Sequence, residues 1–173
     1  MIVSMGESCK VEDANNQNEA VSTEISALDV AKYLIGLAQR DGNPITNLRL
    51  QKLLYYAWGY YWNSFKQYLF KDDIEAWKYG PVVKDVYDEY KIFDGGDIII
   101  DDNVIEENKT KFNQQQQDFF SAFYNLMKKY DTWALVDASH KEKPWKETYN
   151  NGKQIISYDL MKEEFTDDAF DEN

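Results

Sequence analysis

Residues 46–62 have the sequence TNLRLQKLLYYAWGYYW, and this stretch predicts the helix around which the fold is built. Thr46 is a suitable N-cap, because its hydroxyl can accept a hydrogen bond from a free N–H of the first turn. Apolar residues recur at helical spacing and predict one buried face, formed by Leu50, Leu53, Leu54, Ala57, Trp58 and Tyr61. More aromatic residues widen that face, namely Tyr55, Tyr56, Tyr60 and Trp62. We therefore expect this helix to be buried on more than one side.

The segment before it predicts a shorter helix that starts near Ser26. The Ser26 hydroxyl can cap the helix, and Asp29 lies in the first turn, where the helix dipole favours an acid. Small and aliphatic residues follow at helical spacing, namely Ala27, Val30, Ala31, Leu34, Leu37 and Ala38. Gly42 suits the end of this helix and is followed shortly by Pro44.

Residues 68–79 lose the helical period and predict an extended connection or a short strand. Pro81 is expected to open a third helix, because the first helical position tolerates a missing N–H. A Gly-Gly pair at 95–96 ends that helix. Residues 98–100 are three isoleucines, which predict a short β segment that pairs with the stretch near Ile74.

Four more helices are expected in the last third of the chain. They cover Phe112–Tyr130, Trp133–His140 after a cap at Thr132, Pro144–Tyr149, and a last one from a cap at Ser157 to Phe165. The predicted fold is mainly α, a compact single-domain bundle of about six or seven helices with at most a small β element. The helical domain is expected over residues 26–165, between a flexible acidic arm (1–25) and an acidic tail (166–173).

The net charge of −12 is concentrated at the two ends of the chain. Residues 1–25 hold five acids and one lysine, and residues 159–173 hold seven acids and one lysine, so these ends carry −4 and −6. Acidic ends disfavour nucleic acid, because duplex binding needs a basic footprint. They favour a basic protein partner, although acidic tails also serve solubility alone.

Composition also indicates where the protein works. The single cysteine, Cys9, excludes an intrachain disulfide framework, which fits a reducing cytosol. No window approaches the roughly 18 consecutive apolar residues that a membrane-spanning helix needs. The first residues lack a basic region followed by an apolar run, so we expect no secretory signal. The expectation is a soluble cytoplasmic protein without membrane contact.

Three segments together resemble the Panacea domain family, which comprises SocA-like antitoxins and GepA-type phage-associated proteins. The first has DVAKYL at 29–34 followed by ITNLRLQKLLYYA at 45–57. The second has IEAWKYGPVV at 74–83, which leads into Val86 and Tyr87. The third has Ser139-His140 followed by Pro144-Trp145. All three occur in the family's order over about residues 28–150.

The resemblance implies that the protein is an antitoxin of a toxin–antitoxin system. Its partner would then be a cognate toxin protein, encoded by an adjacent gene. Partner toxins differ widely across the family, so the resemblance does not name the toxin. One member is understood to present its toxin to a ClpXP-type protease, which makes a proteolytic adaptor the alternative function.

Five residues of the two strongest segments are predicted to contact the partner: Arg49, Lys52, Trp77, Lys78 and Tyr79. Arg49, Gln51 and Lys52 are expected to project from the side of the helix opposite its apolar face. Aromatic and charged side chains of this kind suit interface anchors. The alternative is that Trp77 and Tyr79 bury their rings and serve the fold alone.

A second set is expected to maintain the fold of the motif: Leu50, Gln51, Leu53, Tyr55, Gly80, Pro81, Val82, His140, Pro144 and Trp145. Gly80 would supply a backbone geometry closed to other residues. His140 is the only histidine, and a metal site would need several more ligands at matched spacing. A packed or hydrogen-bonded histidine is therefore favoured over a ligand or a catalyst.

No nucleophile, phosphate-loop, dinucleotide or zinc-protease motif occurs in the sequence. The adjacent acids Asp72-Asp73, Asp101-Asp102 and Glu106-Glu107 are expected in solvated loops. We therefore predict no enzyme activity, no metal and no cofactor. An enzyme with an unrecognised site remains the third hypothesis, from a different class of function.

Overall fold

The computed structural model describes residues 24–166 of the 173-residue chain. The predicted acidic arm and tail therefore lie outside the described residues, apart from their innermost positions. Glu24 forms an ion pair with Lys71 at 2.9 Å. Ile25 packs, partly buried, against the core. The first helix begins at Ala27 and the last ends at Phe165.

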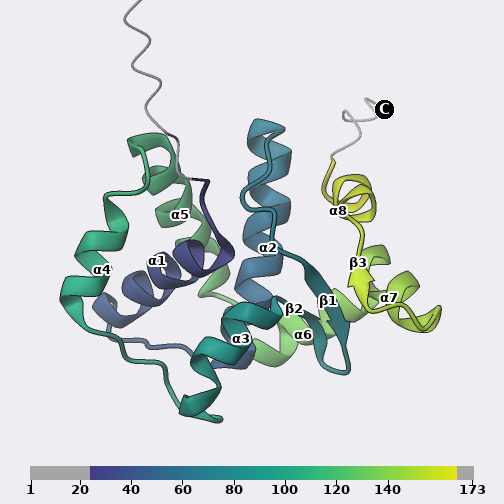
Figure 1. Ribbon diagram of the computed structural model, residues 1–173, viewed down its shortest axis with the longest axis horizontal. Coiled ribbons are helices and arrows are strands. Elements are labelled where there is room, and N and C mark those ends of the chain that lie inside the picture. Colours follow the sequence, from purple (N-terminus) through teal and green to yellow (C-terminus); the bar gives the residue numbers. More distant parts are fainter. Residues whose placement is uncertain (1–23, 167–173) are drawn as a thin grey trace, which may run out of the picture.

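The fold is mainly α with one small β-sheet (Figure 1). The helices of the described residues are α1 (Ala27–Arg40), α2 (Asn47–Phe65), α3 (Lys84–Tyr90), the 3-10 helix η1 (Lys91–Phe93), α4 (Asp102–Lys109), α5 (Gln114–Met127), α6 (Thr132–Lys141), α7 (Lys143–Asn150) and α8 (Tyr158–Phe165). The strands are β1 (Ile74–Trp77), β2 (Gly80–Val82) and β3 (Ile155–Ile156).

Helix α2 stands at the centre of the molecule, with α1, α4 and α5 on one side and α7, α8 and the sheet on the other (Figure 1). Its predicted N-cap is confirmed, because the N–H of Arg49 donates to the Thr46 hydroxyl at 3.3 Å. Every residue from Leu50 to Gly59 is buried, so the helix is enclosed on several sides as its wide apolar face predicts.

Helix α1 begins with the predicted cap at Ser26. The Ser26 hydroxyl accepts from the N–H of Asp29 at 3.1 Å, and the Asp29 carboxylate accepts from the N–H of Ser26 at 3.0 Å. This reciprocal pair is a capping box, which satisfies two backbone donors at once. Asp29 also pairs with Lys111 at 2.6 Å, which ties the start of α1 to the α4–α5 connection.

Helix α4 corrects the expectation of solvated loops at two of the acid pairs. Asp101 caps the helix by accepting from the N–H of Asn103 at 2.7 Å, and Glu106 and Glu107 lie within it. Only Ile105 and Asn108 of this helix are buried. Ile105 is thus its single buried apolar residue, and one such residue does not give the apolar periodicity from which a helix is predicted.

The sheet is antiparallel throughout, with β1 between β2 and β3. The expected start of a helix at Pro81 is wrong, because Pro81 pairs with Ala76 in the β1–β2 hairpin and α3 begins three residues later. The expected strand at 98–100 is also wrong. Ile98 donates its N–H to the carbonyl of Ile45 at 2.8 Å, and the third strand comes from Ile155–Ile156 instead.

The C-terminal helices follow the expectations with one change of cap. Asp131, and not Thr132, caps α6 by accepting from the N–H of Ala134 at 2.8 Å. Pro144 lies in the first turn of α7. Ser157 caps α8 as predicted, accepting from the N–H of Leu160 at 3.2 Å. Within residues 24–166, no helix combines the length and apolar character needed to cross a bilayer.

Candidate partner-binding site

The β1–β2 hairpin carries the second of the sequence motifs, and its turn consists of Lys78 and Tyr79. Gly80 closes the turn at φ +108°, a backbone conformation that side chains strongly disfavour. A Cβ at this position would also lie 2.8 Å from Lys52 Cε and 2.8 Å from Ser139 Oγ. The hairpin therefore approaches α2 and α6 so closely that only glycine fits.

Polar side chains of α2 hold the hairpin from below. The Lys52 ammonium donates to the carbonyl of Pro81 at 2.8 Å. The Gln51 carbonyl oxygen accepts from the N–H of Val83 at 2.9 Å, and its amide donates to Asn47 Oδ1 at 2.9 Å. These bonds satisfy backbone groups that the short strand β2 leaves without a ladder partner.

The expected exposure of Gln51 and Lys52 is wrong. Lys52 is 0% exposed and Gln51 2%, because the hairpin packs on the side of α2 from which they project. Burial also lowers the pKa of Lys52 to about 7. A lysine enclosed in this way cannot reach a partner, so Lys52 is not part of the exposed contact surface.

His140 lies against the other flank of the hairpin. Its ring stacks on Trp145 at a centroid distance of 4.1 Å, and the Trp145 indole donates to the carbonyl of Trp77 at 2.7 Å. Burial, followed by the neighbouring Lys52 charge, lowers the pKa of His140, while Asp137 and the Lys78 backbone oppose that shift. The described residues contain no cluster of three or more metal-ligating side chains around it.

The outer face of the hairpin is formed by Trp77, Lys78 and Tyr79. The Trp77 indole donates to Glu75 at 2.6 Å, and its half-buried ring packs against Tyr87 at 4.9 Å. Tyr79 is 50% exposed, and the Lys78 ammonium lies 5.3 Å from its ring centroid. Aromatic rings that are fixed on one side and exposed on the other are typical of interface anchors.

Trp133 extends this face and was not among the predicted contacts. It is 58% exposed in the first turn of α6, and its ring meets Tyr79 edge-on at 6.1 Å. The sequence offered one signal for it: Trp133 does not share the helical spacing of the buried residues of α6, so an exposed ring could be expected. We call Trp77, Lys78, Tyr79 and Trp133 the hairpin surface.

Arg49 lies at the margin of the hairpin surface. Its guanidinium donates to the Thr132 hydroxyl at 3.4 Å and to the carbonyl of Met127 at 3.1 Å. Thr132 directly precedes Trp133, so Arg49 contacts the start of α6 next to the hairpin surface. Burial lowers the pKa of the half-buried Arg49 side chain. A contact role for its remaining exposed part stays a prediction.

Glu142 is a second residue that the sequence did not single out. Its carboxylate accepts from the hydroxyls of Tyr55 at 2.9 Å and Tyr56 at 2.5 Å, which ties the α6–α7 corner to α2. Burial raises the pKa of Glu142, and the two hydroxyl donors act in the opposite direction. Two of the additional tyrosines of α2 are thus directed to a half-buried acid.

The other residues assigned to the motif's fold are enclosed. Those that are buried are Leu50, Leu53, Tyr55, Gly80, Pro81, Val82 and Pro144. Nearly all of the motif therefore lies beneath the surface, and the turn of the hairpin is its main exposed part.

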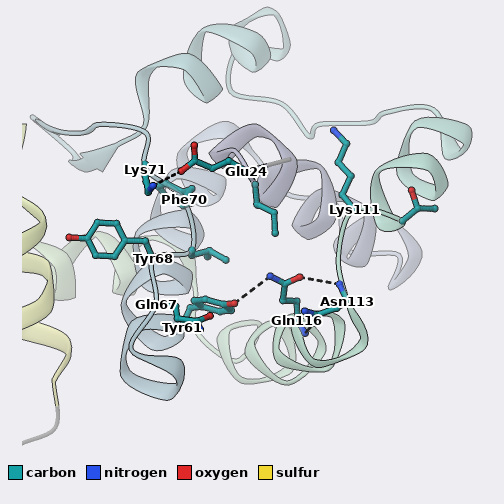
Figure 2. A pocket seen from close by; sticks show the side chains of 12 residues that line it. Glu24, Tyr61, Gln67, Tyr68, Phe70, Lys71, Lys111, Asn113 and Gln116 are labelled. Atoms are coloured by element: carbon teal, nitrogen blue, oxygen red, sulfur yellow. Dashed lines mark hydrogen bonds and ion pairs between the residues drawn. The ribbon is translucent and has the colours of Figure 1, made fainter. Parts of the chain in front are cut away.

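A cavity of about 500 Å³ lies elsewhere, between the loop after α2 and the α4–α5 connection (Figure 2). Its polar groups largely bond to one another or to nearby residues. Gln116 bridges Tyr61 and Asn113, and Lys71 is paired with Glu24. Because these groups already have partners, the cavity offers few of the convergent free polar groups that mark a ligand site.

Comparison with known proteins identifies a family and a relative that this chain resembles. The family described as "Antitoxin SocA-like, Panacea domain" matches residues 50–146, which is more than half of the chain. The antitoxin SocA of Caulobacter vibrioides (strain NA1000 / CB15N) is 43% identical over 63 residues. That stretch makes up 36% of this chain and 34% of the relative, so the likeness spans about a third of each. No solved structure matches.

Proposed function

The chain belongs to the SocA-like antitoxin family with the Panacea domain, and we propose that it neutralises a protein toxin by binding it directly through the hairpin surface. Family membership supports an antitoxin role in general. We expect the toxin to be encoded by an adjacent gene. Neutralisation by direct binding is likewise part of the proposal.

One observation carries the proposal: the buried motif residues converge on holding a single exposed turn. Lys52, Gln51 and Gly80 fix the hairpin from below, and Trp145 fixes it from the side. A surface fixed before binding loses little conformational freedom when a partner docks, which favours affinity.

The chemistry of the hairpin surface favours binding over catalysis. Two exposed aromatic rings and one ammonium lie at its outer face. Of the groups beneath and beside it that could transfer protons or attack a substrate, Lys52 and Ser139 are 0% exposed and the Nε2 of His140 is buried. A substrate could not reach them without displacement of the hairpin.

A growth assay tests the proposal. The toxin from the neighbouring reading frame is induced together with wild type, with Tyr79→Ala or with Lys78→Ala. Wild type is expected to restore growth and to co-purify with the toxin, whereas the two variants protect less at equal protein level. Val104→Ala on α4 serves as the matched control and should protect fully. Full protection by both hairpin variants would contradict the proposed surface.

The same assay separates direct binding from delivery to a protease. In a host lacking the ClpXP-type protease, direct binding predicts unchanged protection and an unchanged toxin level. Loss of protection in that host, with the toxin accumulating, would identify the protein as a proteolytic adaptor.

A further inference from the structure

A small apolar pocket opens beside the hairpin surface, between the first turn of α2, the hairpin and α3. Its volume is about 270 Å³, below the roughly 300–1,000 Å³ typical of small-molecule sites. Leu48, Trp77, Val82 and Tyr87 form its walls. The size and the walls suit a single bulky side chain rather than a whole ligand.

The polar groups at the base of this pocket are bonded to each other. Asn47 donates to the carbonyl of Tyr87 at 3.1 Å and accepts from Gln51, whose own carbonyl oxygen accepts from Val83. A polar occupant would find these groups engaged. An apolar side chain loses nothing there and gains the burial of its surface.

The walls hold their shape without an occupant. The Trp77 ring is fixed by its bond to Glu75 and by its edge contact with Tyr87 at 4.9 Å. Pockets that exist before binding and lie beside exposed aromatic rings are where interface anchors concentrate.

The rim on the α3 side carries one acid, from a segment of the chain with a net negative charge. Asp94 lines the pocket there. Residues 84–97 hold five acids (Asp85, Asp88, Glu89, Asp94 and Asp97) and two lysines, a balance of −3. Both lysines, Lys84 and Lys91, contact Asp88. Lys78 borders the pocket from the hairpin, where it lies over Tyr79.

We propose that this pocket takes one aromatic or large aliphatic side chain of a partner protein, from a segment in which basic residues flank that side chain. The partner is the toxin, so this identification rests on the proposed function. The pocket supplies the apolar anchor site, and Asp94, within its acidic segment, favours the flanking Lys or Arg by charge complementarity.

Short blocked peptides test this inference without the toxin. The probes are acetyl-Lys-Phe-Lys-amide, acetyl-Glu-Phe-Glu-amide and acetyl-Lys-Ala-Lys-amide, titrated into the ¹⁵N-labelled full chain. The indole N–H of Trp77, assigned with Trp77→Phe, reports on the pocket. The Lys-Phe-Lys peptide should give saturable shifts at millimolar concentration and bind at least about threefold more tightly than Glu-Phe-Glu. That preference should fade at high salt, and Lys-Ala-Lys should leave the indole signal unmoved.

Two pairs of variants assign the effects to the pocket. Leu48→Lys should abolish binding of Lys-Phe-Lys, while Val104→Lys, which adds the same charge on α4, should not. Asp94→Asn should remove most of the preference for basic flanks, while Asp159→Asn should preserve it. The amide spectrum of each variant checks that the fold is intact.

Equal binding of the three peptides, or shifts that survive Leu48→Lys, would overturn the inference. Because no toxin takes part, peptide binding without toxin neutralisation would reject the proposed function and keep the pocket. Toxin neutralisation without peptide binding at Trp77 would reject the pocket and keep the proposed function.

Discussion

Lys52 places an amine in the interior, enclosed by α2, α6 and the hairpin, with the carbonyl of Pro81 as its bonded acceptor. Burial disfavours its charged form, which is why its pKa falls to about 7. The side chain connects the hairpin to α2 through this bond. Below about pH 7 it is charged, and the buried charge lowers the stability of the folded state. Ser139 and His140 of α6 and Gly80 of the hairpin are its neighbours.

This arrangement predicts how stability changes with pH. The unfolded state holds the Lys52 proton up to its usual pKa, whereas the folded state releases it near pH 7. Between those values the unfolded state binds more protons, so the contribution of Lys52 to the free energy of unfolding rises with pH. It is most unfavourable below about pH 7 and is relieved as the pH approaches the unfolded pKa.

Lys52→Met should remove that dependence. Relative to the variant, wild type should gain about 2 kcal/mol in the free energy of unfolding between pH 7 and pH 9. Urea unfolding of both proteins across this range provides the measurement. Parallel curves for the two proteins would show that Lys52 keeps an ordinary pKa in the folded state.

At the scale of secondary-structure elements, the contact between α2 and α8 depends on close packing. A Cβ on Gly59 would lie 2.3 Å from the ring of Phe165, so the glycine makes room for that ring. Tyr55 meets Phe165 edge-on at 5.3 Å, and Tyr56 and Tyr60 each do so at 6.1 Å. One glycine and three tyrosines of α2 thus form the surface against which Phe165 of α8 packs.

Gly59→Ala should displace α8. Alanine favours the helix by about 1 kcal/mol, but overpacking typically costs about 1–3 kcal/mol, so we expect a net loss of stability. Hydrogen exchange should show faster exchange of α8 amides while the α1 amides are unchanged. In a Phe165→Ala background the same substitution should be neutral or stabilising. An equal effect in both backgrounds would show that Phe165 is not what excludes the side chain.

The elements divide into those that local sequence determines and those that it does not. The caps at Ser26, Thr46 and Ser157 were predictable, because an N-cap depends on residues within one turn. The helix α4 and the strand position of Pro81 were not. The first has almost no apolar period, and the second depends on pairing with β1 and on a bond from Lys52, 29 residues earlier.

At the scale of the whole molecule, α2 collects parts of the candidate site that are far apart in the chain. The hairpin brings Trp77, Lys78 and Tyr79, and α6 brings Trp133 to the same surface. The sequence indicated the hairpin residues through the motif. It predicted that Lys52 is exposed, because a charged side chain indicates solvent unless a segment distant in the sequence covers it. It did not indicate Trp133, because that residue joins the hairpin surface only through its contact with Tyr79.

The binding affinity of the cognate toxin for a hairpin variant is the most direct test of the account. Calorimetric titration would compare wild type with the double variant Lys78→Ala/Tyr79→Ala and with the matched control Lys109→Ala/Val104→Ala on α4. Loss of a true anchor costs about 2 kcal/mol or more, so the hairpin variant should bind at least about thirtyfold more weakly. Its melting temperature should lie close to that of wild type, because Lys78 is exposed and Tyr79 is 50% exposed, and substitutions at the surface change stability little. Wild-type affinity in the hairpin variant would contradict the central claim that this surface contacts the toxin.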